Sequence, residues 1–587
     1  MAKPRTVQLT TEAGARLAGT PWDVYPRPQL RRDGWINLNG EWDFAVRPPK
    51  ADPDESVRYD GRITVPYPPE AALSGVGAHF PEGSVLYYRR RFVLDEIPPG
   101  KRLLLHIGAA DQSVRVRLDG RQLGSFCTPL DGPAAIPLSA LRTGEHELVI
   151  AVTDDLRRKQ FPYGKQTRKR GGMWYTPFSG IWQTVWLEWV PETYISGLKI
   201  TPSLTGATVE VIEASAKSPR ASSARPYIEC EGVRFPIVDG KATIRPEQPH
   251  LWTPEDPYLY EFTVKTATDE VRSYFALRTV ETKLVDGRPR ICLSGKPYFL
   301  HALLDQGYWP DGICTPASPK CYEDDILAMK RLGFNTLRKH IKLEPAQFYY
   351  DCDRLGMLVM QDMVNNGHYS YLFDTVLPTL GIQKLPEFLP LRRGSVRRCF
   401  RAAMASTVRR LYNHPCIVYW TIFNEGWGQF APSENYERLR ALDPTRIIDT
   451  TSGWFRGGRT DVESRHVYFS EFRVPKSDKP VVLSEFGGFC CKIPGHSFNL
   501  DKTYAYRFFD TREAYMDALE ALYRERIIPA ARAGLCGAVY TQLSDVEDET
   551  NGLLTYDRRI CKPDEERMRA IAKYLHPNVP MCIGNRE

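Results

Sequence analysis

The 587-residue sequence has no long apolar run. No segment approaches the roughly 18–20 apolar residues that a membrane span requires, so we expect no membrane partner. Residues 1–19 are polar and lack the apolar core of a secretory signal, which predicts a cytoplasmic protein. The GxGxxG, P-loop and HExxH motifs are missing as well, so the sequence predicts no nucleotide or redox cofactor and no metal centre.

Cysteine motifs are also missing. The thirteen cysteines, an odd number, show neither a CxxC pair nor the Cys/His spacing of a metal site. Without a secretory signal, we expect reduced thiols rather than disulfides. The basic residues behind the net charge of +7 are dispersed except at 168–170 and 338–342, and no nucleic-acid-binding motif accompanies them. Nucleic acid is therefore not an expected partner.

The length of the chain exceeds what one hydrophobic core can organise, and it predicts about three or four domains. Residues 1–190 contain short alternating apolar runs between Gly, Pro and Asp turns, with a hairpin signal at Asp119-Gly120. This pattern predicts a jelly-roll or related β-sandwich. Residues 191–282 repeat it on a smaller scale, which predicts a second sandwich of immunoglobulin type.

Residues 283–587 alternate apolar strands with amphipathic helices. The clearest helical stretches are 323–332, 396–411 and 512–533. Eight strands are predicted, at 298–304, 335–338, 358–363, 417–424, 446–450, 466–469, 481–484 and 535–541. Eight strands alternating with helices predict a (β/α)8 TIM barrel, whose active site would lie at the C-terminal ends of the strands.

Two of these predicted strands end in a glutamate. The buried strand 417–424 is followed by Glu425 and a glycine, and the strand 481–484 is followed by Glu485 and two glycines. A lone strand-end glutamate is commonly a solvated or salt-bridged rim residue. Two of them at one mouth are what a retaining glycosidase needs, one as acid/base and one as nucleophile.

The motifs around these strands resemble those of glycoside hydrolase family 2, which includes β-galactosidases, β-glucuronidases and β-mannosidases. The matching segments are Asn-His-Pro at 413–415, Asn424-Glu425, and Ser-Glu-Phe-Gly at 484–487. Segments 38–42, 87–92 and 179–183 resemble the sugar-binding first domain of the family. The resemblance implies an N-terminal jelly-roll β-sandwich, an immunoglobulin-like β-sandwich and a C-terminal (β/α)8 TIM barrel.

The resemblance also implies roles for the strand-end residues. Glu425 would be the acid/base and Glu485 the nucleophile. Asn424 would contact the 2-hydroxyl of the sugar, and Trp427 would help to position the sugar or to raise the pKa of Glu425. A like charge at Glu485 would raise that pKa further.

Further candidates to bind the substrate follow other barrel strands or lie in a glycine-flanked aromatic loop of the first domain. They are Asp305, Arg338, His340, Tyr468, Tyr540 and Trp174. The family arginine, here Arg338, supports the carboxylate of the nucleophile, and a tyrosine at the position of Tyr468 lies nearby. His340 is one place away from the family histidine, because the usual Ser-His-Tyr-Pro is replaced here. Asp305 is equally a candidate turn cap, and Tyr468 a candidate core residue.

The sequence indicates the identity of the substrate sugar less clearly than it indicates the catalytic residues. In the family, β-glucuronidases use an Asn-x-Lys pair near the end of the barrel to bind the uronate carboxylate, and segment 550–559 lacks this lysine. The three-domain length nevertheless resembles β-glucuronidases more than five-domain β-galactosidases. The cluster 338–342 is an alternative carboxylate site, unless Lys339 and Lys342 are solvated on the barrel rim.

The sequence thus predicts a retaining exo-β-glycosidase acting on terminal β-linked galacto-configured sugars, either a β-galactoside or a β-galacturonide. The alternatives are a β-glucuronidase, a mannoside or arabinoside specificity, and a non-catalytic carbohydrate-binding protein on the same fold. The expected partner is a small glycoside or oligosaccharide. A homo-oligomer is also expected, because family members are often dimers or tetramers.

Overall fold

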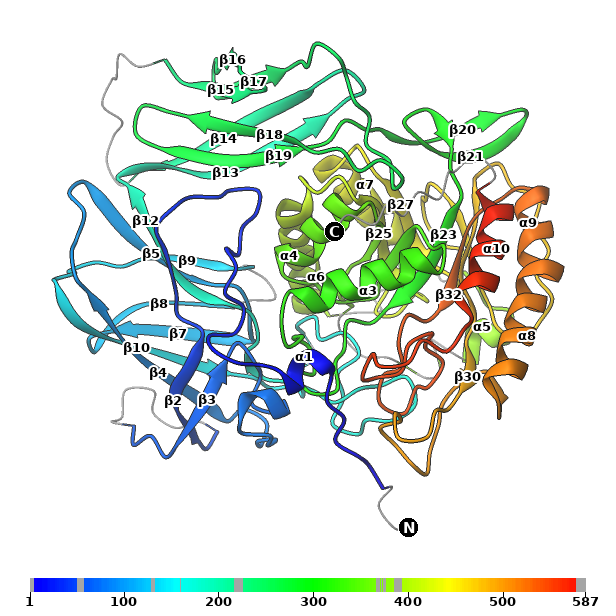
Figure 1. Ribbon diagram of the computed structural model, residues 1–587, viewed down its shortest axis with the longest axis horizontal. Helices are drawn as coiled ribbons and strands as arrows, with labels where there is room; N and C mark the ends of the chain where they lie inside the picture. The colour runs from blue at the N-terminus through cyan, green and yellow to red at the C-terminus, as the bar shows by residue number, and fades with distance from the viewer. Residues whose placement is uncertain are drawn as a thin grey trace.

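The computed structural model of the chain describes residues 5–576, with the exception of 50–56, 128–131, 159, 216–224, 366–369, 371, 373–375 and 385–392. Two β-sandwiches lie beside a barrel of parallel strands covered by helices (Figure 1). The predicted fold class, two sandwiches followed by a TIM barrel, is confirmed. The division of the chain at about 190 and 282 stays a prediction. None of the described helices is long and apolar enough to cross a membrane.

The first sandwich packs a six-stranded sheet against a four-stranded one, both antiparallel. The six-stranded sheet has the order β3(Gly61–Val65), β2(Gly40–Arg47), β4(Val85–Leu94), β10(Gly144–Thr153), β7(Ser113–Leu118) and β8(Arg121–Cys127). The other has the order β1(Trp35–Asn37), β12(Val185–Pro191), β5(Lys101–Ile107) and β9(Ala134–Pro137). The predicted hairpin joins β7 to β8, with positive φ at both Asp119 and Gly120 as a type I′ turn requires.

The second sandwich is smaller. One sheet has the order β13(Thr193–Pro202), β14(Ala207–Ser215) and β17(Lys241–Ile244), and the other β16(Val233–Pro236), β15(Tyr227–Cys230), β18(Tyr260–Lys265) and β19(Glu270–Phe275). Buried Arg32 holds it to the first sandwich through Glu188 and Asp269. Tyr274 of β19 donates a hydrogen bond to Asp353 of the barrel region at 2.7 Å. These buried polar contacts fix the sandwiches against the barrel.

The eight predicted barrel strands are all present, and they pair in parallel. Their order is β27(Ile447–Ser452), β26(Ile417–Asn424), β25(Leu358–Asp362), β24(Thr336–Lys339), β23(Leu300–Asp305), β32(Leu535–Thr541), β29(Val481–Gly487) and β28(Glu463–Val467). The outer layer includes α3(Lys320–Arg331), α4(Ala346–Leu355), α6(Gly394–Leu411), α7(Pro432–Leu442) and α10(Glu565–Leu575). The helix expected at 512–533 is α8(Arg512–Leu522) and α9(Ile528–Ala533), joined by a π-helical turn.

A long connection of the first sandwich, between β10 and β12, reaches the mouth of the barrel (Figure 1, in cyan). The backbone N–H of Tyr163 donates to the carbonyl of Asn365, just after β25, at 3.2 Å. Tyr175 donates its hydroxyl proton to Glu549, and the N–H of Thr176 donates to Glu547. The first sandwich therefore supplies part of the wall around the C-terminal ends of the barrel strands.

Candidate active site

The two strand-end glutamates meet at the mouth of the barrel. Glu425 directly follows β26, and Glu485 lies within β29, which runs on to Gly487 rather than ending at residue 484. A carboxylate oxygen of each, together with Nδ1 of His466, forms a group whose members all lie within 4.8 Å of one another. Glu425 has φ +49°, a left-handed conformation that costs a residue with a Cβ about 1–3 kcal/mol. The backbone of Glu425 is thus held in a strained conformation at the end of β26.

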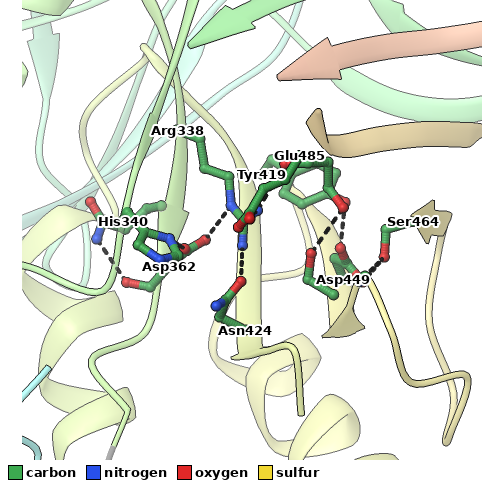
Figure 2. A network of polar contacts seen from close by, with 12 residues as sticks. Arg338, His340, Asp362, Tyr419, Asn424, Asp449, Ser464 and Glu485 are labelled. Atoms are coloured by element: carbon green, nitrogen blue, oxygen red, sulfur yellow. Dashed lines mark hydrogen bonds and ion pairs between the residues drawn. The ribbon is translucent and has the colours of Figure 1, made fainter. Parts of the chain in front are cut away.

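A fully buried guanidinium organises the floor of the site. Arg338 donates to Oε1 of Glu485 at 3.0 Å, to Oδ1 of Asp362 at 3.0 Å and to Oδ1 of Asn424 at 2.8 Å. Figure 2 shows Arg338 between these three acceptors, each from a different strand. Since the guanidinium is planar and its donors are fixed, it sets the orientation of all three side chains. The prediction had named Arg338 and Asn424, but not Asp362.

Glu485 is held as a carboxylate. Tyr468 donates its hydroxyl proton to Oε2 of Glu485 at 2.6 Å, and its ring stacks on Tyr506 with 3.6 Å between centroids. Burial raises the pKa of Glu485, but the charges of His466 and Arg338 and the Tyr468 hydrogen bond outweigh it, so that the pKa is lowered. At neutral pH the Glu485 side chain is therefore ionised and fixed at both oxygens.

His466 is a site residue that the sequence analysis missed. Its Nδ1 lies 3.0 Å from Oε1 of Glu425 and 3.4 Å from Oε2 of Glu485, and its Nε2 lies 3.3 Å from Oγ of Ser452. One signal was available: His466 stands two residues before Tyr468, and alternate residues of a strand face the same side. The group Glu425, His466 and Glu485 has the spacing of a metal site. It does not fit one well, because the Arg338 guanidinium already neutralises Glu485 from 3.0 Å away.

His340 contacts the site residues although it lies one position away from the histidine of the family pattern. Its Nδ1 lies 2.7 Å from Oδ2 of Asp362, the carboxylate that also accepts from Arg338 (Figure 2). Burial and then the charge of Lys165 lower the pKa of His340 to about 4. The imidazole is therefore neutral at pH 7, and its Nδ1–H is the group that donates to Asp362.

The two predicted tryptophans lie against each other. The rings of Trp174, from the first-sandwich connection, and Trp427, just after Glu425, stack with 5.4 Å between centroids and 22° between planes. Trp427 is buried and Trp174 half-buried. This contact joins the first sandwich to the segment that carries Glu425.

The comparisons with known proteins fit this geometry. Residues 317–561 match the family described as "Glycosyl hydrolases family 2, TIM barrel domain", and residues 193–278 match "Glycosyl hydrolases family 2". Together the two matches span more than half of the chain. The chain belongs to glycoside hydrolase family 2.

Family 2 relatives are distant in sequence. A β-galactosidase of Pectobacterium atrosepticum is 24% identical over 490 residues, which are 74% of this chain but only 44% of that protein. A β-galacturonidase structure from Eisenbergiella tayi has a TM-score of 0.66 at 19% identity, covering 94% of this chain and 98% of the other. A β-D-glucuronidase structure from Dictyoglomus thermophilum has a TM-score of 0.69 at 17% identity, covering 95% and 99%. At such identities the structural likeness shows the fold alone.

In this family 2 chain, the side chains of two of the predicted substrate-binding residues, Asp305 and Tyr540, do not hydrogen-bond to the other site residues. Asp305 accepts from the N–H of Gly307 at 2.9 Å and pairs with Lys339 at 2.5 Å, so both of its oxygens are used within the protein. The hydroxyl of Tyr540 accepts from the N–H of Phe489, and its buried ring packs among apolar side chains. Successive residues of a strand face opposite sides, so Thr541 faces the site where Tyr540 does not. The hydroxyl of Thr541 lies 3.0 Å from that of Tyr468.

The lysines of the cluster 338–342 are not solvated on the rim, and their hydrogen bonds are used within the protein. Lys339 and Lys342 are buried, and both bind Glu344, at 3.0 and 2.9 Å. Lys342 also donates to the carbonyls of Gly307 and Cys314. The expectation that they are solvated on the rim is therefore wrong, because buried Glu344, which the sequence pattern did not reveal, pairs with both. Carboxylate binding by the cluster 338–342 stays a prediction.

Proposed function

We propose that this protein is an exo-acting retaining β-glycosidase in which Glu425 is the acid/base and Glu485 the nucleophile. The observation that carries the proposal is the distance of at most 4.8 Å between carboxylate oxygens of the two residues. Retaining enzymes hold their carboxyl groups about 5–5.5 Å apart, whereas inverting enzymes need about 6.5–9.5 Å to admit a water. The short separation supports direct attack by one carboxylate.

In the first step, the Glu485 carboxylate attacks the anomeric carbon while Glu425 gives its proton to the departing glycosidic oxygen. Arg338 and Tyr468 support this attack by fixing both oxygens of Glu485. Among the described residues, none hydrogen-bonds to Oε2 of Glu425, which leaves that oxygen to face the leaving group. A covalent glycosyl–enzyme ester then forms and the aglycone departs as an alcohol.

In the second step, ionised Glu425 takes a proton from water, and the water oxygen displaces Glu485 from the anomeric carbon. The sugar leaves with its original β configuration, and both carboxyl groups return to their starting states. Asn424 would bind the 2-hydroxyl with its amide N–H, since its amide oxygen already accepts from Arg338. Such a bond strengthens in the transition state.

For the substrate we propose a terminal β-linked, galacto-configured sugar, a β-galactoside or a β-galacturonide. The names of the relatives include β-galactosidases, a β-galacturonidase and β-glucuronidases, so they support this range beside a glucuronide. The missing lysine of segment 550–559 argues against the ordinary glucuronidase mode of carboxylate binding. Arabinosides and mannosides stay outside the proposal.

Turnover of five matched aryl β-glycosides tests the proposal: galactoside, glucoside, mannoside, glucuronide and galacturonide. We expect hydrolysis of the galacto-configured pair, and NMR of the first product should show the β-anomer. An α-anomer would contradict the retaining mechanism. No turnover of any of the five would favour a non-catalytic carbohydrate-binding protein.

A further inference from the structure

One buried lysine of the described residues differs from the other three. Lys339 and Lys342 pair with Glu344, and Lys562 likewise has a carboxylate partner. Lys165 is only 6% exposed, yet its ammonium makes no hydrogen bond and no ion pair with any described residue. Its ammonium lies over the faces of two aromatic rings, 5.4 Å from the centroid of Tyr175 and 6.0 Å from that of Trp427.

Lys165 lies beside the candidate active site. It belongs to the first-sandwich connection, next to the segment that binds the carbonyl of Asn365 at the end of β25. Trp427, one of the two rings under its ammonium, stands two residues after Glu425. After burial, its charge is the largest influence that lowers the pKa of His340, which hydrogen-bonds to Asp362 in the Arg338 network.

A cavity of about 110 Å³ lies in front of this lysine, with His340, Gln306 and Tyr308 in its wall. The described residues of the wall include a single carboxyl group, that of Asp111. Asp111 accepts a hydrogen bond from Gln166 at 3.2 Å rather than from Lys165, and burial raises its pKa to about 7. Lys342 and Arg410 also line the wall, and Lys342 is paired with Glu344. Lys165 thus faces the cavity without a carboxylate partner among the described residues.

Holding the ammonium of a side chain that is only 6% exposed without an anionic partner costs free energy, because the ammonium keeps few of the water contacts that it has in the unfolded chain. Such an arrangement is explained when a ligand supplies the missing anion. Two contacts link Lys165 to the glutamates: the ring of Trp427 lies 6.0 Å from its ammonium, and His340 of the same cavity shares Asp362 with Arg338. A terminal sugar between the two glutamates would direct an anionic group toward this side. A neutral hydroxymethyl group would leave the ammonium uncompensated.

We infer that Lys165 binds the carboxylate of the substrate sugar, and that the substrate is therefore a β-uronide rather than a neutral β-galactoside. This inference rests on the proposed function, since it assigns the sugar that the two glutamates would act on. Within the galacto-configured range it selects the β-galacturonide. The charge would come from the first sandwich, while the reacting groups come from the barrel.

The variant Lys165→Met tests this inference, because it keeps the aliphatic stem and removes the charge. We expect the ratio of kcat/KM for aryl β-galacturonide over aryl β-galactoside to fall about 10- to 100-fold, the typical loss of a charge-assisted hydrogen bond. Lys169→Met is the matched control, since Lys169 lies in the same connection but is exposed. It makes the same change in net charge and should leave the ratio unaltered.

Thermal unfolding separates a ligand-binding lysine from a structural one. Removing an unpaired buried charge should not lower the Tm of Lys165→Met, whereas loss of a structural lysine would lower it. Free galacturonate should raise the Tm of the wild type and not that of the variant, and free galactose should raise neither to the same extent.

Three results would overturn the inference: an unchanged specificity ratio in Lys165→Met, a lowered Tm of that variant, or wild-type turnover of the galactoside alone. In the last case the proposed glycosidase function would stand. If no glycoside were turned over but galacturonate still raised the Tm in a Lys165-dependent manner, the catalytic proposal would fail and carboxylate binding by Lys165 would be upheld.

Discussion

The C-terminal ends of the barrel strands carry polar side chains on two sides, one facing the inside of the barrel and one facing the surrounding helices. Arg338 faces inward and binds Glu485 at 3.0 Å. The next residue, Lys339, faces outward and binds Glu344 at 3.0 Å, with the ring of Phe348 from α4 at 4.2 Å. Adjacent residues of one strand thus belong to two separate charge networks.

The two networks differ in how completely they are satisfied. Outside the barrel, Glu344 accepts from Lys339, Lys342 and Tyr322. Asp305 also pairs with Lys339, and the carbonyls of Gly307 and Cys314 also accept from Lys342. Inside, one oxygen of Glu425 has no hydrogen-bond partner among the described residues. Buried polar groups that are fully paired stabilise a unique fold, while those with spare capacity can bind and react. We therefore expect inward substitutions to change catalysis and outward substitutions to change stability.

The largest expected effect is that of Glu485→Gln, an inward change. It removes the attacking carboxylate at nearly constant volume, so kcat should fall by at least about 10⁴-fold, while the Tm is retained. The measurement is turnover of the best aryl glycoside beside thermal unfolding. Glu463→Gln, at the opposite end of the barrel where β28 begins, is the control and should keep wild-type activity. Near-normal turnover by Glu485→Gln would disprove the assignment of the nucleophile.

The outward counterpart is Glu344→Gln, which leaves buried Lys342 without a carboxylate partner and Lys339 with Asp305 alone. The free energy of unfolding in urea should fall by about 3–5 kcal/mol, while kcat of the remaining folded protein stays close to normal. Glu437→Gln breaks an exposed pair with Arg459 and should cost less than about 1 kcal/mol. An equally small loss in Glu344→Gln would show that the outer network is not stabilising.

The stabilisation by Glu344 should also depend on pH. Burial raises its pKa, but the charges of Lys339 and Lys342 lower it below the ordinary value overall. Its contribution is therefore complete above the unfolded pKa of about 4.3 and is lost as the pH falls through the lower folded value. The difference between wild type and Glu344→Gln should be constant near pH 7 and shrink only in acid.

A smaller effect is expected for Tyr468→Phe, which removes one hydrogen bond from Glu485. This bond lowers the pKa of Glu485, so its loss should raise that pKa. The acidic limb of kcat/KM should then move to higher pH by about 0.5–1 unit, and kcat should fall about tenfold. A pH–rate profile measures both. An unmoved acidic limb would mean that Glu485 does not set it.

The smallest effect on activity is expected for Tyr540→Phe, the outward neighbour of Thr541. It deletes a hydroxyl that accepts from the N–H of Phe489, which should cost about 1–2 kcal/mol of stability. Activity should stay within about twofold, because the ring does not reach the site. A loss of activity as large as that of Tyr468→Phe, at unchanged stability, would return Tyr540 to the candidate substrate-binding residues.

Most of the barrel follows from local sequence pattern. Each strand is a short apolar run between helices, as 417–424 illustrates, and the sheet can bury such runs in only a few ways. The positions of Glu425 and Glu485 after two predicted strands identified them as a pair, because the C-terminal ends of all parallel barrel strands lie at the same end of the barrel. The family motifs then supplied Arg338, Asn424 and Tyr468.

The sequence by itself determined the eight strands, the two sandwiches and the glutamate pair, because these depend on apolar periodicity along the chain. The tertiary structure decided which side chain at each strand end faces inward and which partner it meets. It separated Arg338 from Lys339 and Thr541 from Tyr540, since a strand shift of one residue exchanges the two faces. It also placed Lys165 where no described residue pairs with it, because its neighbours Trp427 and His340 lie far away in the sequence and no local pattern records their approach.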